Sequence, residues 1–195
     1  MSKVKMAIMV SGGGTNMQSI IDEIEKGNIN GEIEIVISSN PKAYALERAR
    51  IHNIEAVYIG KENCKSAEEI KEKTLKVLEE KGIELIILAG YMSIIDKAII
   101  EHYKNRIINV HPSLIPSFCG KGYYGKRVHQ AAIDYGVKIT GATVHFVDEG
   151  IDTGKIIAQQ AVEVKEDDTA DSLASRVLEI EHKLLPLAIK KVIGG

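Results

Sequence analysis

The amino-acid sequence predicts an α/β fold with a doubly wound, mostly parallel sheet and helices on both faces, a Rossmann-like arrangement. Apolar segments rich in Ile and Val recur along the first half of the chain. Most of them are continuous rather than alternating, as is typical of strands covered on both faces. Amphipathic helical patterns lie between them. The expected strands span residues 4–10, 33–37, 56–59, 83–89 and 107–110.

The first helix is expected directly after the first strand. Met17, Ile20, Ile21 and Ile24 follow one another at helical spacing, which gives a single apolar stripe. Gly27 comes after the last apolar position and supplies a C-terminal stop. This segment therefore predicts a helix with one buried face.

A second helix is expected after the third strand, where the N-terminal signal is clear. Ser66 and Glu69 form a capping-box pattern, and Gly82 stands just past the expected end. The positions of the stripe between them are Ile70, Thr74, Val77 and Leu78.

The pattern changes after Val110. Pro112, Pro116 and a Gly- and Tyr-rich stretch at 120–125 predict a long irregular connection, and long ordered loops usually carry function. The elements expected after it are a helix at 126–135 and strands at 140–147 and 155–164.

A final amphipathic helix is expected near the C-terminal end. Its apolar positions are Leu173, Val177, Ile180, Leu184 and Leu187. Pro186 lies inside this pattern, and proline removes a helical hydrogen bond. We therefore expect the helix to be kinked or shortened there.

Composition and charge exclude several classes of function. The chain has 195 residues, a formal net charge of −2 and no clustering of its basic residues, so no nucleic-acid partner is expected. No apolar run approaches the ~20 residues of a membrane span. Cys64 and Cys119 have neither disulfide nor zinc spacing. We expect a single cytoplasmic domain over residues 1–195, with small-molecule substrates, no membrane partner and no metal, as a monomer or homodimer.

A glycine-rich turn, Ser-Gly-Gly-Gly-Thr-Asn at 11–16, lies between the first strand and its helix. Backbone N–H groups and the positive helix end meet there, so a phosphate is the natural ligand. The P-loop Gly-Lys-Ser/Thr is absent, and Met17 replaces the third glycine of the dinucleotide fingerprint. The polar residues at 38–40 include no acid to bind a ribose diol, which disfavours NAD. The alternative is a tight turn in which Thr15 and Asn16 only cap the helix.

Three polar residues form a candidate catalytic group. Asn109 and His111 stand two residues apart at the end of an expected strand, so they project from the same face. Ligands of open α/β sheets bind at such strand ends. Asp152 lies between Ile151 and a Thr-Gly turn that could fold it toward His111, where a carboxylate would stabilise the imidazolium form.

Four motifs along the chain occur in a characteristic order. They are the glycine turn at 11–16, Leu-Ala-Gly-Tyr-Met at 88–92, Asn-Val-His-Pro-Ser-Leu-Ile-Pro at 109–116, and His-Phe-Val at 145–147 followed by Asp152. In order and spacing they resemble the glycinamide ribonucleotide formyltransferases of the formyltransferase superfamily over nearly the whole chain. The resemblance implies the formyltransferase fold. It also implies transfer of a formyl group from 10-formyltetrahydrofolate, a co-substrate, to the amine of 5'-phosphoribosylglycinamide in purine biosynthesis.

The resemblance implies roles for individual residues as well. Asn109 and His111 would stabilise an oxyanion at the formyl group, with Asp152 assisting. The stretch 178–181 would border the substrate. The implied substrate-binding residues are Gly14, Thr15 and Asn16 for the phosphate and Glu181 for the ribose. The implied folate-binding residues are Met92, Ser93, Ile94, Ile95, Asn109, Asp148, Glu149, Gly150 and Ile151.

The chain departs from the family pattern on the folate side. Family members often carry arginine where this chain has Ser93 and Ala67. Lys65 or Lys71 is the candidate replacement for the second arginine.

The loop at 117–125 is also longer than the short form of the family. It is either a lid that brings Lys121 near phosphate or folate, or a surface excursion. Cys119 within it lacks the setting of a nucleophile, and no implied step needs a thiolate.

Three other kinds of protein share features with this chain and are alternatives to this function. Formyltetrahydrofolate deformylase has the same catalytic group, but its members carry a further N-terminal domain that is absent before Met6. Methionyl-tRNA formyltransferase needs a C-terminal RNA-binding domain and a basic surface. A non-catalytic nucleotide-binding sensor on the same fold is the alternative from another class, and the joint presence of Asn109, His111 and Asp152 argues against it.

Overall fold

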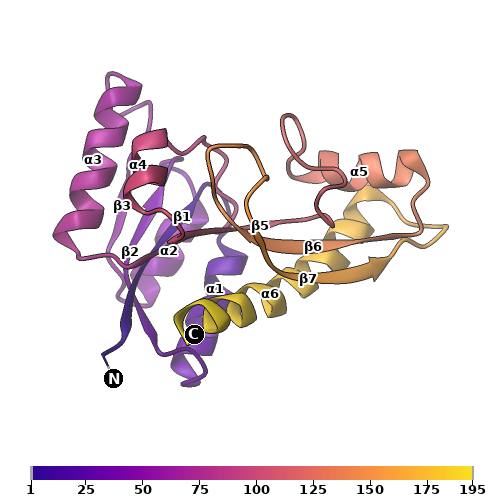
Figure 1. Ribbon diagram of the computed structural model, residues 1–195, viewed down its shortest axis with the longest axis horizontal. Coiled ribbons are helices and arrows are strands. Elements are labelled where there is room, and N and C mark those ends of the chain that lie inside the picture. The colour runs from indigo at the N-terminus through magenta and orange to yellow at the C-terminus, as the bar shows by residue number, and fades with distance from the viewer. Residues whose placement is uncertain (1, 195) are drawn as a thin grey trace.

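The structure is a computed structural model that describes residues 2–194. Within these residues seven strands form one sheet in the order β3-β2-β1-β4-β5-β6-β7 (Figure 1). Strands β1 to β5 are parallel to their neighbours, whereas β6 and β7 are paired antiparallel. The bounds are β1 Val4–Val10, β2 Gly31–Ser38, β3 Ala56–Tyr58, β4 Leu85–Leu88, β5 Ile107–His111, β6 Ile139–Phe146 and β7 Ile156–Glu163. The predicted mostly parallel sheet is confirmed.

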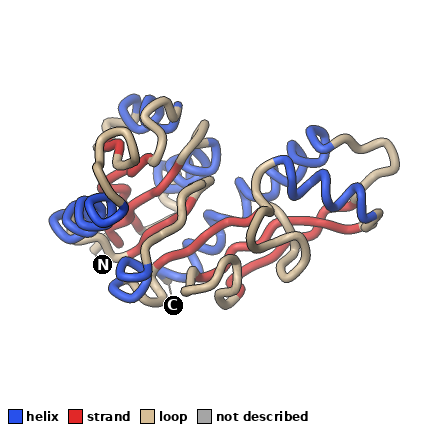
Figure 2. Tube along the Cα trace, turned by 90° about the horizontal axis from the view of Figure 1, so that it is seen from above, coloured by secondary structure: helices blue, strands red, loops and turns tan. Residues whose placement is uncertain are grey.

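Helices cover both faces of this sheet. Their bounds are α1 Thr15–Glu25, α2 Tyr44–Ile51, α3 Ala67–Glu80, α4 Lys97–His102, α5 Lys126–Tyr135 and α6 Ala170–Ile193. Alternate residues of β1 divide between the two layers: Met6 and Ile8 pack with α1, α2 and α6, whereas Ala7 and Met9 pack with α3 and α4. Both layers are apolar, which explains why the strand sequences are continuous rather than alternating. Figure 2 shows β6 and β7 extending beyond the rest of the sheet, with α5 beside them.

The final helix differs from its prediction. Helix α6 continues through Pro186 to Ile193, so it is not shortened at the proline. Pro186 is itself buried, together with Leu184, Leu185 and Ala188, and this packing on the sheet offsets the one hydrogen bond that proline removes. Leu187, predicted to lie on the apolar stripe, is 48% exposed. The buried face continues instead through Leu185, Ala188 and Ile189.

The N-terminus of α3 largely follows its predicted cap. The Ser66 side chain accepts a hydrogen bond from the Glu69 N–H at 3.1 Å, and Gly82 has φ +62° after the helix end. The Glu69 carboxylate reaches the N–H of Lys65 at 2.6 Å, one residue earlier than the capping-box pattern predicts. The shorter α2 and α4 had no individual prediction, because so few residues cannot repeat an apolar stripe.

The carboxyl ends of three parallel strands lie together. The Ser11 N–H, just after β1, donates to the Gly90 carbonyl after β4 at 3.0 Å, and Leu88 pairs with Asn109 of β5. The glycine turn, the 90–95 segment and the end of β5 therefore share one edge of the sheet, where open α/β folds bind ligands. Within residues 2–194, no helix combines the length and apolar character needed to span a membrane.

Candidate active site

The glycine turn leads directly into α1. Gly14 is the N-cap residue, with φ +73°, and no described side chain caps the helix. A Cβ at position 14 would lie 2.7 Å from the Ala45 Cβ, so both backbone conformation and packing require glycine. N–H groups at a helix start without a side-chain cap can donate to an anion. Thr15 and Asn16 therefore do not cap helix α1, whereas the positive φ of Gly14 is the one that a tight turn requires.

Asn16 in the first turn of α1 contacts α6. Its Nδ2 donates to Glu181 Oε2 at 2.6 Å, and the two residues are 7% and 8% exposed. Burial raises the pKa of Glu181, and the hydrogen bond from Asn16 offsets this only in part. The Asn16 Oδ1 has no partner within residues 2–194. Two of the predicted substrate-binding residues thus lie together with unused hydrogen-bonding capacity.

Asn109 is held by a residue on the neighbouring strand. Strand β6 places His145 directly opposite Asn109, and the Asn109 Nδ2 lies 3.2 Å from the His145 Nε2. The His145 Nδ1 is 2.8 Å from the Phe146 carbonyl oxygen, which can only accept, so Nδ1 carries a hydrogen. His145 therefore orients the Asn109 amide, and the second N–H of that amide remains for a ligand.

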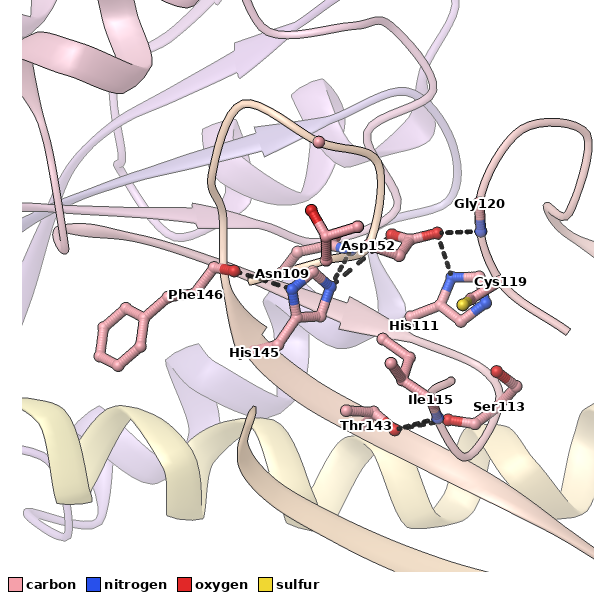
Figure 3. A network of polar contacts seen from close by, with 12 residues as sticks. Asn109, His111, Ser113, Ile115, Cys119, Gly120, Thr143, His145, Phe146 and Asp152 are labelled. Atoms are coloured by element: carbon pink, nitrogen blue, oxygen red, sulfur yellow. Dashed lines mark hydrogen bonds and ion pairs between the residues drawn. The ribbon is translucent and has the colours of Figure 1, made fainter. Parts of the chain in front are cut away.

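His111 lies between Asp152 and the loop at 117–125, as Figure 3 shows. Its Nδ1 is 3.5 Å from Asp152 Oδ2, and its Nε2 donates to the Phe118 carbonyl oxygen at 3.0 Å. Both ring nitrogens face oxygen atoms, and only the protonated ring can donate to both. The structure thus places Asp152 beside His111, as the sequence predicted.

Asp152 reaches this position from the turn after β6. Its φ of +58° is left-handed, a conformation that aspartate adopts more readily than most residues. Its Oδ2 accepts from the Gly120 N–H at 2.9 Å, and its Oδ1 lies 3.7 Å from His145 Nε2. Burial alone would raise the pKa of Asp152, but His145, the Gly120 N–H and the charge of His111 together outweigh burial and lower it. Asp152 is therefore held as a carboxylate.

The loop at 117–125 contacts the candidate catalytic group through its backbone, at the Phe118 carbonyl and the Gly120 N–H. The segment that leads into it is tied to β6, because Thr143 Oγ1 donates to the Ser113 carbonyl at 2.6 Å. In turn, Ser113 Oγ donates to the Ser117 carbonyl at 2.6 Å. These contacts favour a role in the site over a surface excursion.

The predicted folate residues of the 92–95 segment divide by exposure. Met92 and Ile94 are 55% and 87% exposed, and Ile151 across the site is 48% exposed. Ile95 is only 8% exposed and packs in the core with α3 and α4. The Ile95 side chain thus lies in the core, where burial stabilises an apolar group, and the role of this residue in the folate pocket stays a prediction.

The acidic residues of the predicted folate pocket have structural partners. Asp148 Oδ1 accepts from the Gly150 N–H at 3.1 Å and from Thr153 Oγ1 at 2.6 Å, which folds the turn that carries Asp152. Glu149 pairs with Lys97 at 3.0 Å. Lys71 pairs with Glu68 of its own helix.

Two hollows lie away from the candidate catalytic group, whose residues line neither of them. They have volumes of about 480 and 470 Å³ and are lined mainly by residues of α1 and α6. The second reaches Thr15 and Arg48, beside the glycine turn. Across the described part of the chain, no group of three or more His, Cys, Asp or Glu side chains is placed to hold a metal ion.

Comparisons with known proteins agree with this geometry. The formyl transferase family model matches residues 4–189. The chain is 36% identical to the phosphoribosylglycinamide formyltransferase of Bacillus subtilis, covering 97% of this chain and 95% of that protein. Among solved structures, the phosphoribosylglycinamide formyltransferase of Bacillus halodurans superposes with a TM-score of 0.90 at 37% identity, covering 97% of this chain and 95% of that one.

The chain belongs to the formyl transferase family. It is also 38% identical to the chloroplastic phosphoribosylglycinamide formyltransferase of Arabidopsis thaliana, over 92% of its own length but 62% of that relative. It spans 58% of the corresponding relative from Vigna unguiculata, to which it is equally similar. Membership of the formyl transferase family confirms the resemblance drawn from the four motifs.

Two parts of this formyl transferase site had no predicted role. His145 belonged to a recognised motif, yet its function as the partner of Asn109 depends on the antiparallel register of β5 and β6. The alternation of the two strands could have indicated it, because directly paired residues face the same side. The backbone contacts of Phe118 and Gly120 carry no side-chain signal.

Proposed function

We propose that this chain transfers the formyl group of 10-formyltetrahydrofolate to the amine of 5'-phosphoribosylglycinamide, as a single catalytic unit. The observation that carries the proposal is the cluster at the end of β5, where the Asn109 amide and His111 lie beside an ionised Asp152. Relatives named phosphoribosylglycinamide formyltransferase support the choice of acceptor.

Asn109 and His111 are the donors to the developing negative charge. As the substrate amine attacks the formyl carbon, the second Asn109 N–H and the His111 Nε2–H donate to the formyl oxygen. Each such donor contributes about 10² to 10³ in rate. In this step the formyl oxygen replaces the Phe118 carbonyl as the acceptor for His111. The loop at 117–125 therefore loses its hydrogen bond from His111 when the formyl donor binds.

Asp152 keeps His111 charged and assists proton movement. The new bond forms between the amine nitrogen and the formyl carbon, and the bond from that carbon to the folate nitrogen breaks. The amine loses a proton and the leaving nitrogen gains one. A carboxylate beside His111 can accept and return that proton through water, because its low pKa keeps it ionised at neutral pH.

The remaining predicted residues fit the two substrates. The uncapped N–H groups at Gly14, Thr15 and Asn16 suit the phosphate. Glu181 suits the ribose hydroxyls because, among the described residues, its carboxylate accepts a hydrogen bond only from Asn16. Exposed apolar side chains of Met92, Ile94 and Ile151 suit the flat rings of a folate.

Formyl release from 10-formyltetrahydrofolate tests the proposal. The reaction is followed by absorbance with and without added 5'-phosphoribosylglycinamide. Release that requires the amine supports the transferase. Release without the amine would identify a deformylase instead, and absence of release in both reactions would favour a nucleotide-binding sensor.

A further inference from the structure

The carbonyl groups of the glycine turn are fixed by helix α2. The Gly12 carbonyl accepts from the Ala45 N–H at 3.1 Å, and the Gly13 carbonyl accepts from Arg48 Nε at 2.8 Å. In a planar trans peptide the carbonyl and the following N–H point in opposite directions. Holding these two carbonyls toward α2 therefore directs the N–H groups of Gly13 and Gly14 away from it.

Arg48 is ordered by two further contacts. Its Nη1 donates to Gln18 Oε1 at 3.3 Å, and its guanidinium lies over the Tyr44 ring, 5.1 Å from the centroid. Gln18 is held in turn, because its Nε2 donates to Asp22 Oδ1 at 2.8 Å. A guanidinium has donors in a rigid planar fork and stacks on aromatic rings, so a single side chain makes all three contacts.

The residues around the turn carry a second, independent observation that points to a ligand. Asn16 is buried, and its Oδ1 has no partner within residues 2–194. Arg48, Thr15 and Lys183 line the hollow of about 470 Å³. The guanidinium also places a positive charge beside the peptide group whose N–H, that of Gly14, would bind an anion.

We propose that Arg48 is a positioning residue for phosphate binding. By holding the Gly13 carbonyl toward α2, it presents the Gly14 N–H to the phosphate group of the substrate. The identity of that substrate rests on the proposed function, but the binding of a phosphate group to the turn does not.

Arg50 provides a matched control on the same helix. Its guanidinium pairs with Glu47 at the surface, so its removal changes the net charge equally without touching the glycine turn. The variants are Arg48→Met, Arg48→Lys and Arg50→Met. Inorganic phosphate is the probe, and its affinity is measured from the rise in melting temperature with concentration.

We expect Arg48→Met to bind inorganic phosphate about tenfold more weakly than the wild-type protein, the effect of losing one charge-assisted hydrogen bond. Arg50→Met should stay within about twofold of wild type. Arg48→Lys should lie between them, because an ammonium keeps the charge but cannot reproduce the fork. The Arg48→Lys comparison still decides the question if the methionine variant does not fold.

Three results would overturn the proposal. These are equal phosphate affinity in the Arg48→Met and Arg50→Met variants, full wild-type affinity in Arg48→Lys, and absence of saturable phosphate binding by the wild-type protein. Steady-state assays add a second readout, in which Arg48→Met raises KM for the phosphorylated substrate while kcat is retained. If phosphate affinity follows Arg48 but no formyl transfer occurs, only the proposed function is wrong.

Discussion

A half-buried carboxylate and a buried one serve different parts of the candidate site. Asp152 beside His111 accepts a backbone N–H and faces two imidazole rings, and its pKa is lowered despite burial. Glu181 beside Asn16 receives one amide hydrogen bond, and burial raises its pKa. The charge of Asp152 is thus balanced by the protein alone. The Glu181 carboxylate can accept more hydrogen bonds than the protein provides. This is expected of a group that also accepts hydrogen bonds from the hydroxyls of a substrate.

The difference between the two carboxylates indicates how the catalytic part around Asp152 and the substrate-binding part around Glu181 act. A group that must keep a neighbour protonated needs a permanent charge, whereas a group that binds a ligand can leave hydrogen bonds unmade until the ligand arrives. The catalytic part should therefore govern kcat, and the substrate part should govern KM.

Removal of His111 should have the largest effect and should separate the two parts. We expect His111→Ala to lower kcat about 10³-fold, because a donor to the formyl oxygen is lost. Binding of the phosphorylated substrate should change little, since Glu181 and the glycine turn are intact. Single-turnover kinetics and calorimetric titration measure the two quantities. Undiminished turnover would exclude His111 from the catalytic group.

Substitution of Asp152 should have the next largest effect. Asp152→Asn should lower kcat about 10²-fold by removing the charge that supports His111.

The same variant tests the electrostatic state of Asp152. Because its pKa is lowered in the folded protein, the ionised carboxylate stabilises the fold above its unfolded pKa, and this contribution is lost as pH falls through the folded pKa. Urea unfolding of both proteins should therefore differ most at neutral pH and converge at acidic pH. A difference that grows in acid would contradict the assignment.

Glu181→Gln should affect binding and stability in opposite directions. We expect KM for the phosphorylated substrate to rise about tenfold, because the ribose loses a charged acceptor. At neutral pH the variant should be more stable by about 1 kcal/mol, since it no longer buries a charge.

The stability gain should depend on pH. The raised pKa of Glu181 means that its favourable protonated state is fully present below the unfolded pKa and is lost as pH rises through the folded pKa. The advantage of the variant should thus disappear in acid. Thermal unfolding across pH measures it, and equal melting temperatures at neutral pH would show that Glu181 carries no burial penalty.

Cys119→Ser should have the smallest effect, although Cys119 lies in the loop beside His111. Burial and then Asp152 raise the pKa of the Cys119 thiol, so the thiolate is disfavoured. We expect kcat to stay within about twofold of wild type, since no step of the proposed reaction uses a thiolate. A large loss in steady-state assays would place the sulfur in the reaction.

Local patterns in the sequence determined most of the fold. Continuous apolar runs predicted the strands, and Met17, Ile20 and Ile21 predicted the buried face of α1. They also placed Asn109 and His111 on one face of β5, because side-chain direction alternates along a strand. Each of these features depends on residues within a few positions of one another.

Tertiary structure alone decided the contacts that complete the site. Asn16 meets Glu181 across 165 positions, His145 faces Asn109 through the register of β5 and β6, and Arg48 reaches the glycine turn from α2. Ile95 is buried although its neighbours are exposed. Periodicity specifies which face of an element is apolar, but register and helix packing choose the residue opposite, and that choice depends on the whole chain.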